Sequence, residues 1–348
     1  MCFKFFSQDL GIDLGTANTL IYSKEKGILL NEPSVVAVDH NDQVMATGRE
    51  AKAMIGRAPA NIRVVRPLQD GVISDFIMTQ VMLKEYLRKV MEKRASVTSM
   101  RVVVGVPSGV TEVEKRAVED VVHQMGAKEV YILTEPMAAA IGAGLAVDAA
   151  EGCMIADIGG GTSDIAIIAL GGIVTSTSLR YAGDKMDEAI VAYMRKNFGL
   201  LIGEKTAEDV KKTVGCVYPV EPSEDVVTSM EAKGRDLVSG LPRTVNVTSS
   251  DIMSALEEPI GIILDGIKNT LEQAPPELAA DIVNNGLMLA GGGALLRGID
   301  KLIEYHTGMH VTIADNALEA VAQGTGMSLS DIEKVKRYAY SDKQYMYQ

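Results

Sequence analysis

The chain has 348 residues, which is enough for two hydrophobic cores, because a single core usually stops growing at roughly 250–300 residues. Apolar residues make up 47% of the sequence, and this proportion excludes an intrinsically disordered chain. The net charge of −12, without any long run of Lys or Arg, argues against nucleic acid as a partner.

The first half of the chain predicts short strands followed by helices and buried strands. Ser74 is expected to cap a helix over residues 75–94, and Thr111 with Glu114 forms a capping box for a helix whose apolar face includes Val113. Pro136 lies where the first turn of another helix would begin. The predicted strands span residues 20–22, 28–30, 35–38, 101–107 and 129–133.

The second half repeats this order of element types. Its longest predicted helix, residues 249–273, contains Pro259 and Gly261, which should kink or divide it. A buried strand near residue 288 leads through a glycine turn into a further helix. The other predicted elements are strands at 165–170 and 173–178 and helices at 184–198 and 206–212.

Two segments share one pattern: "GIDLGTANTLIY" (11–22) and "IADIGGGTSDIAII" (155–168). Each has an aspartate, an apolar residue and a glycine, then a small polar turn, then a β-branched run. The turn leads into a strand in both cases, whereas the phosphate loop of a P-loop or Rossmann protein leads into a helix. Both segments therefore predict β-hairpins.

Glycine-rich hairpin turns expose backbone N–H groups that can bind an anion without obstruction by a Cβ atom. Either turn alone would be an ordinary hairpin, but the matched pair predicts a clamp for a polyphosphate. Asp13 and Asp157 end the preceding strands, where carboxylates suit Mg²⁺ held mostly through water. The turn residues are Gly15, Thr16, Ala17 and Asn18 in the first hairpin and Gly159, Gly160, Gly161 and Thr162 in the second.

A third glycine turn, Gly291, Gly292, Gly293 and Ala294, leads from a strand into a helix. By itself it would be a tight turn that permits close helix packing. Beside two phosphate-binding turns, it is expected to let the adenosine end of a nucleotide approach the backbone.

The motifs "GIDLGTANT", "TEPMAAAIGAGL", "DIGGGTSD" and "AGGGA", in this order, resemble the ATPase superfamily of actin, heat-shock chaperones and sugar kinases. Segments such as "VRPLQDGVISDF" and "LLIGEKTAEDVKK" are similar to the MreB family, the bacterial actins of rod-shaped cells. This resemblance implies an α/β, actin-like ATPase fold that binds ATP and Mg²⁺. Its two related domains, each a mixed β-sheet with helices and a smaller subdomain, would flank a nucleotide cleft.

The resemblance also implies domain limits. Domain I would comprise residues 1–147 and 316–348, with a small subdomain at about 33–70. Domain II would comprise residues 148–315, with a small subdomain at about 183–250.

The resemblance assigns roles to particular side chains. Glu135 matches the family's water-orienting glutamate and Thr162 its second water-positioning residue, so both would be catalytic. Lys52 matches a lysine that meets the γ-phosphate, and Glu208 and Lys211 match residues at the ribose and adenine. The alternatives are a first-turn helix glutamate for Glu135, a solvated surface lysine for Lys52, and an ordinary ion pair within one helix for Glu208 and Lys211.

For function, the family implies ATP hydrolysis coupled to polymerisation into paired protofilaments that govern cell shape and cell-wall synthesis. The filaments would lie at the inner face of the cell membrane and dock membrane-bound cell-wall synthesis or morphogenesis proteins. The family often carries two large apolar residues in the loop that is residues 92–100 here, and only Met100 is comparable. Membrane contact would therefore depend on Phe3, Phe5 and Phe6.

A cytoplasmic location fits the three widely spaced cysteines, which form neither a metal pair nor a disulfide framework. Two other functions remain open, a soluble chaperone-type ATPase and a small-molecule kinase. The residues after Gly298 are too few for a peptide-binding domain, and no sequence feature assigns a kinase base.

Overall fold

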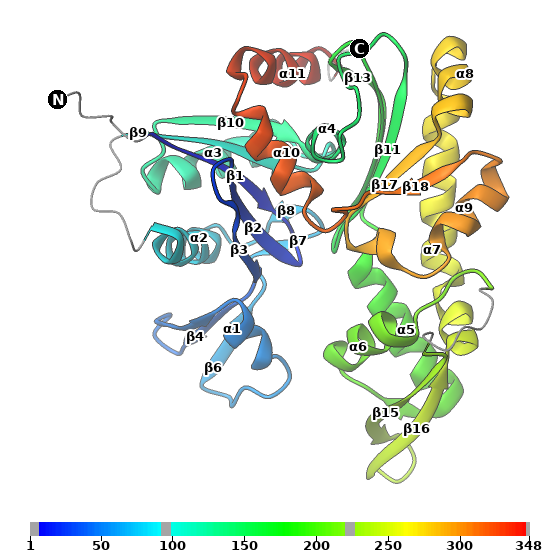
Figure 1. The fold of residues 1–348 in the computed structure, drawn as a ribbon. Coiled ribbons are helices and arrows are strands. Elements are labelled where there is room, and N and C mark those ends of the chain that lie inside the picture. Colours follow the sequence, from blue (N-terminus) through cyan, green and yellow to red (C-terminus); the bar gives the residue numbers. More distant parts are fainter. Residues whose placement is uncertain (1–6, 92–98, 220–226, 346–348) are drawn as a thin grey trace.

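The computed structural model describes residues 7–91, 99–219 and 227–345, and the chain forms two halves that each contain a five-stranded mixed sheet (Figure 1). In the first sheet, β1 pairs antiparallel with β2 and parallel with β9. The strands of this sheet are β1 (Ser7–Leu14), β2 (Asn18–Ser23), β3 (Gly27–Pro33), β9 (Ser99–Val106) and β10 (Glu129–Thr134).

The second sheet has the same connectivity. The orders β3-β2-β1-β9-β10 and β13-β12-β11-β17-β18 correspond strand for strand, and β11 pairs antiparallel with β12 and parallel with β17. Both glycine hairpins therefore join the first and second strands of their sheets. The strands are β11 (Cys153–Ile158), β12 (Ser163–Ala169), β13 (Gly172–Leu179), β17 (Leu287–Ala290) and β18 (Val311–Ile313).

Each half also carries a small three-stranded sheet, and the two small sheets lie at the lower end of the molecule in Figure 1. One consists of β4 (Val36–Asp39), β5 (Val44–Thr47) and β6 (Ile62–Val65), the other of β14 (Leu200–Leu201), β15 (Ser229–Asp236) and β16 (Pro242–Thr248). A short hairpin, β7 (Leu68–Gln69) and β8 (Val72–Ile73), follows the first small sheet.

Helices pack around these sheets and join the halves. In Figure 1, α4 and α10 lie between the two large sheets, and they pack closely because Gly324 of α10 faces the carbonyl of Ala138 in α4. The helices are α1 (Arg49–Ala53), α2 (Phe76–Met91), α3 (Glu112–Gln124), α4 (Glu135–Gly142), α5 (Gly183–Phe198), α6 (Glu204–Val214), α7 (Ser249–Glu272), α8 (Pro276–Asn285), α9 (Ile299–Thr307), α10 (Ala320–Ser328) and α11 (Ile332–Tyr345), with a 3₁₀ turn at Gly292–Leu295.

Two local expectations for helix starts and faces are wrong. Asp75, not Ser74, caps α2, because its Oδ1 accepts a hydrogen bond from the Met78 N–H at 3.0 Å. Ser74 instead donates to the Pro67 carbonyl. The capping box of Thr111 and Glu114 is present at α3, but Val113 is 78% exposed and belongs to the outer face.

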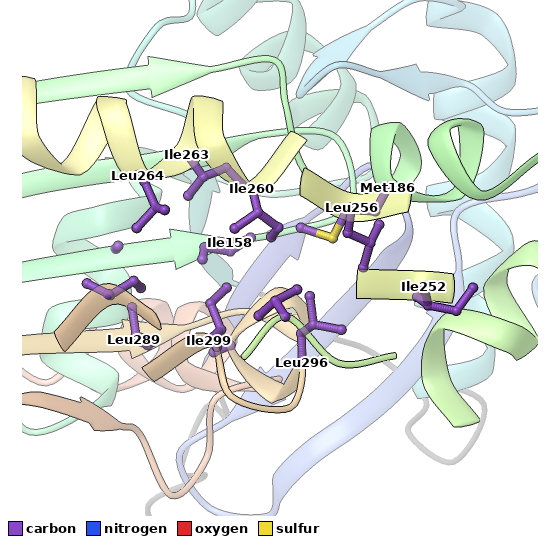
Figure 2. Close-up of a cluster of buried hydrophobic side chains, with 14 of the residues drawn as sticks. Ile158, Met186, Ile252, Leu256, Ile260, Ile263, Leu264, Leu289, Leu296 and Ile299 are labelled. Carbon is purple, nitrogen blue, oxygen red and sulfur yellow. The ribbon is translucent and has the colours of Figure 1, made fainter. Parts of the chain in front are cut away.

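The expected division of the long helix at Pro259 is also wrong, since α7 is one continuous helix of 24 residues. Side chains on both sides of Pro259, Ile252 and Leu256 before it and Ile260 and Ile263 after it, belong to one buried cluster. Figure 2 shows Ile260 beside Ile158, with Ile252 at the far end of the group. Burial of each such side chain contributes about 1.5–3 kcal/mol, which together exceeds the cost of about 3 kcal/mol for one internal proline.

The strand that follows the second glycine turn is buried on both faces. Ile165 and Ile167 of β12 pack in the cluster that contains α7, whereas Ala166 and Ile168 pack in the cluster that contains α4. This burial explains the unbroken apolar run in the sequence, and it fixes the position of the turn that precedes the strand.

Candidate functional site

The two glycine hairpin turns face each other and are in contact. A Cβ atom placed on Gly160 would lie 2.5 Å from the Ala17 Cβ, and one placed on Gly161 would lie 2.5 Å from the Thr16 Oγ1. Only glycine permits this approach, because real Cβ atoms essentially never come within 3.0 Å of such neighbours. The turns from the two sheets therefore form one continuous surface, as the matched pattern predicts.

This surface is the floor of a cavity of about 1470 Å³. Nearly all residues expected at a nucleotide site line it, and they come from both halves of the chain. The lining includes Asp13, Gly15, Thr16, Ala17, Asn18, Lys52, Glu135, Asp157, Gly159, Gly160, Gly161, Thr162, Glu208, Lys211, Gly291, Gly292 and Gly293.

Ala294 is the exception, because it is not among the residues that line the cavity. Its side chain is fully buried in the core of the second half. Its backbone N–H donates to the Gly291 carbonyl at 3.3 Å within the 3₁₀ turn.

The third turn contacts the end of β11. Gly291 has φ +79°, and a Cβ there would lie 2.5 Å from the Asp157 Oδ1. A Cβ on Gly293 would overlap the Ile158 side chain. These glycines therefore permit close packing, which is the alternative interpretation of the pattern, and Gly291 also borders the carboxylate of Asp157.

Four carboxyl groups lie near enough to one another beneath the turns to affect their ionisation. Asp157 and Asp164 lie opposite each other on β11 and β12, and Glu135 is only 8% exposed. Burial, followed by the charges of Asp164, Asp13 and Asp157, raises the pKa of Glu135 well above its usual value. Burial raises the pKa of Asp13 to about 7, and burial with the charges of Asp13 and Asp164 raises the pKa of Asp157.

This concentration of buried acid fits a divalent cation, because carboxylate oxygens are the ligands that Mg²⁺ prefers and its charge would offset their repulsion. Asp13 and Asp157 are the candidates, since Asp164 already accepts hydrogen bonds from the backbone and hydroxyl of Ser108 at 2.9 and 2.7 Å. Within the described parts of the chain, no three His, Cys, Asp or Glu side chains converge as a metal cluster. Water and phosphate oxygens would have to supply the remaining ligands.

Glu135 owes its position to the junction of β10 and α4. Thr134 is the N-cap of α4, and Pro136 lies in the first turn, where it costs no hydrogen bond. The carboxyl group thus lies at a helix N-terminus, yet it lines the cavity and is not a solvated surface group.

Charged residues at the opposite end of the cavity are paired differently from the sequence expectation. Glu208 binds Lys52 at 2.8 Å and Lys212 at 2.6 Å, whereas Lys211 binds Asp187 at 2.9 Å. The alternative of a Glu208–Lys211 ion pair is therefore wrong. Lys52 is also not a freely solvated lysine, because its ammonium group is bound to Glu208 across the cavity.

These pairings determine the charge of Glu208. Burial by itself would raise the pKa of Glu208, but hydrogen bonds from Lys212 and Lys52 outweigh it and lower the pKa to about 2. The carboxylate is therefore ionised throughout the physiological pH range.

Sequence reasoning missed several cavity residues. Asp184 and Asp187 line the cavity from the first turns of α5, where Asp187 binds Lys211, and Gly71 contacts both glycine turns. An Asp–Gly pair flanked by hydrophobic residues, here Leu68 and Val72, is a hairpin signal. Nothing local indicates that this hairpin reaches the cavity.

Phe3, Phe5 and Phe6 lie outside the described residues. Within the described ranges, no helix has the length and apolar character needed to cross a bilayer.

The corresponding sheets, the facing turns and the cleft between the halves define an actin-like, nucleotide-binding class of protein. A family model described as MreB/Mbl protein matches residues 7–337. The chain therefore belongs to the MreB/Mbl family of actin-like, cell shape-determining proteins.

Relatives and solved structures agree with this assignment. The chain is 49% identical to cell shape-determining protein MreB of Escherichia coli K12 over 94% of this chain and 95% of that protein. It is 46% identical to cell shape-determining protein Mbl of Bacillus subtilis 168, over 95% and 98%. The structure of MreB 5 of Spiroplasma citri bound to AMPPNP matches with a TM-score of 0.88 and 39% identity, covering 95% of this chain and 98% of that one.

A MamK double helical filament shares the fold, with a TM-score of 0.79 at 22% identity over 94% of this chain and 99% of that one.

Proposed function

We propose that this protein binds ATP with Mg²⁺ in the cleft, hydrolyses the ATP, and polymerises into paired protofilaments whose stability depends on the bound nucleotide. The observation that carries this proposal is the contact between two glycine turns from equivalent positions of two sheets, above a group of buried carboxylates. Exposed backbone N–H groups on both sides suit a polyphosphate, and the carboxylates suit its cation.

We assign the following binding roles to the residues that line the cavity. The turns 15–18 and 159–162 hold the phosphates, and Gly291, Gly292 and Gly293 border the nucleoside. Asp13 and Asp157 hold Mg²⁺ mostly through water, and this ion neutralises charge on the phosphates. Glu208 and Lys211 bind the ribose and adenine, and Lys52 approaches the γ-phosphate once it leaves Glu208.

Hydrolysis depends mainly on the orientation of the attacking water, because phosphoryl transfer requires little covalent help from the protein. Glu135 lines the cavity from the N-terminus of α4 and Thr162 from the second turn. We assign to both the orientation of this water. Solved structures of MreB 5 with AMPPNP and with ADP support nucleotide binding at such a site.

In the cell, the filaments would associate with the inner face of the cytoplasmic membrane, with Phe3, Phe5 and Phe6 as the contact. Weak contacts of single subunits would add up along a polymer. Membrane-bound cell-wall synthesis or morphogenesis proteins would be the partners. The domain limits expected from the sequence, 1–147 with 316–348 and 148–315, belong to the same proposal.

The test of hydrolysis is Glu135→Ala, measured by phosphate release at saturating ATP and Mg²⁺. We expect a loss of about 100-fold or more in turnover, as for other residues that position a reacting water, with ATP-dependent pelleting retained. Glu129→Ala is the matched control, because this exposed glutamate begins the strand that Glu135 follows. Turnover of Glu135→Ala within twofold of the wild type would refute the assigned role.

Sedimentation with ATP tests the filament. Turnover without any pelletable polymer would contradict the proposal and favour a chaperone-type ATPase or a small-molecule kinase. Absence of Mg²⁺-dependent nucleotide binding would refute all three.

A further inference from the structure

The β7–β8 hairpin ends in a two-residue turn, Asp70–Gly71, that enters the cavity. Both residues have positive φ, 50° and 78°, as a type I′ turn requires. The base of the hairpin is fixed, because Leu68 is only 2% exposed and packs in the core of the first half with Val72 and Ile73. A rigid hairpin therefore holds Gly71 against the site.

Gly71 contacts both glycine turns. Its backbone N–H donates to the Thr16 Oγ1 at 3.0 Å. Its Cα side faces the second turn, since a Cβ on Gly71 would lie 2.6 Å from the Thr162 Cγ2 and 2.7 Å from the Pro107 Cγ. One residue without a side chain thus sets the spacing between this hairpin and both turns.

Of these two neighbours, Thr162 belongs to the second glycine turn, and its side chain is hydrogen-bonded to the Asp164 carboxylate. Pro107 is a rigid ring, and the next residue, Ser108, is held by two hydrogen bonds to the Asp164 carboxylate. The Cγ2 and hydroxyl of Thr162 share one Cβ atom. Anything that displaces the methyl group therefore also displaces the hydroxyl.

We propose that Gly71 is a positioning residue for hydrolysis, because its lack of a side chain sets where the Thr162 hydroxyl lies. This inference rests on the proposed function, in which Thr162 orients the attacking water. Gly71 does not itself touch the reacting atoms. Its effect should therefore appear in the rate of hydrolysis and not in the affinity for ATP.

The test compares Gly71→Ala with Gly27→Ala. Gly27 has a similar φ of 72° and no atom within 4 Å of its position for a Cβ, so both variants place alanine at a similar positive φ but only one has the clash. We expect Gly71→Ala to lower the single-turnover rate of hydrolysis at least about tenfold, because small misplacements of reacting groups have large effects. Its ATP affinity should stay within about threefold of the wild type, and Gly27→Ala should change neither quantity more than about twofold.

A second substitution tests whether Gly71→Ala lowers the rate of hydrolysis through the Thr162 side chain. Thr162→Ser keeps the hydroxyl and removes the Cγ2 that the methyl group added by Gly71→Ala would meet. We expect Gly71→Ala to lower the rate less than about threefold when Ser replaces Thr162, so the two changes are not additive. Equal losses in both backgrounds would mean a general structural role and would overturn the inference.

Leu68→Ala keeps the inference testable if Gly71→Ala does not fold. It removes the side chain that fixes the base of the hairpin and that does not line the cavity, so the rate should fall with affinity retained. An unchanged rate, or a loss of affinity alone, would overturn the inference. If the wild-type protein fails to hydrolyse ATP, the proposed function itself is wrong; if it hydrolyses ATP and Gly71→Ala is as active, only the inference is wrong.

Discussion

At the scale of residues, burial opposes the ionisation of four neighbouring carboxyl groups, those of Asp13, Glu135, Asp157 and Asp164. The charges of the neighbouring carboxylates add to this effect at Glu135 and Asp157. The raised pKa of Asp13 has a direct consequence for the pH dependence of stability. Its pKa is about 7 in the folded protein against 3.8 for an ordinary aspartate. The folded state thus binds more protons than the unfolded state between these values, and its stability falls as the pH rises through about 7.

We therefore expect the melting temperature of the nucleotide-free protein to fall between pH 5 and pH 8 and to fall less in Asp13→Asn. Mg²⁺ should reverse part of this loss at pH 8, where Asp13 is ionised, and have little effect at pH 5, where the carboxyl group is protonated. Thermal denaturation across this range, with and without Mg²⁺, is the measurement. Equal pH slopes for the wild type and Asp13→Asn would contradict the assignment.

At the scale of elements, the crossing of α4 and α10 brings the backbones of two helices from distant parts of the chain into close contact. A Cβ on Gly324 would overlap the Ala138 carbonyl, and one on Gly142 would overlap the Ala320 carbonyl. Neither glycine is needed for an unusual φ. Both are needed for space, so the distance between the two helices at this point depends on the absence of a methyl group at each position.

The same substitution should have opposite effects in two helices. Gly324→Ala should destabilise the protein by about 1–3 kcal/mol or more, because the added methyl group has no room. Gly261→Ala, in α7, meets no atom within 4 Å and should stabilise the helix by up to about 1 kcal/mol. Denaturant unfolding measures both. A Gly324→Ala protein as stable as Gly261→Ala would show that the crossing has more space than described.

At the scale of the whole molecule, two ion pairs join α6 to the first half across the cavity. Arg66 binds Glu204 at 2.8 Å, and Lys52 binds Glu208 at 2.8 Å. Both pairs link segments of different halves on the side where the small sheets lie. They oppose separation of the halves and therefore the release of a bound nucleotide.

Arg66→Glu should accelerate nucleotide release about two- to fivefold, since a partly exposed pair contributes about 0.2–1 kcal/mol. Glu204→Arg should have a similar effect, and the double exchange should restore the slower release. Stopped-flow measurement with a fluorescent nucleotide tests this, and the differences should shrink at high salt. If the double exchange releases nucleotide as fast as the single variants, the pair does not hold the cleft closed.

Features set by local chemistry were predictable. The two hairpin turns, the Thr111 capping box and the start of α4 at Pro136 depend on residues a few positions apart, and each is confirmed. The meeting of the two turns followed from their matched pattern. The pairing of Glu208 with Lys52 and the place of Gly71 did not follow, because their partners lie far away in the sequence.

The amino-acid sequence by itself determined the order of the elements, the family and the two glycine-rich hairpin turns, because strand, turn and cap preferences act over a few residues and leave a readable pattern. Only the tertiary structure decided that α7 continues through Pro259, that Ala294 lies in the core, and that the Asp70–Gly71 turn reaches Thr162. The physical reason is that packing free energy and steric exclusion arise between segments far apart in the chain, and they outweigh local preferences wherever the two conflict.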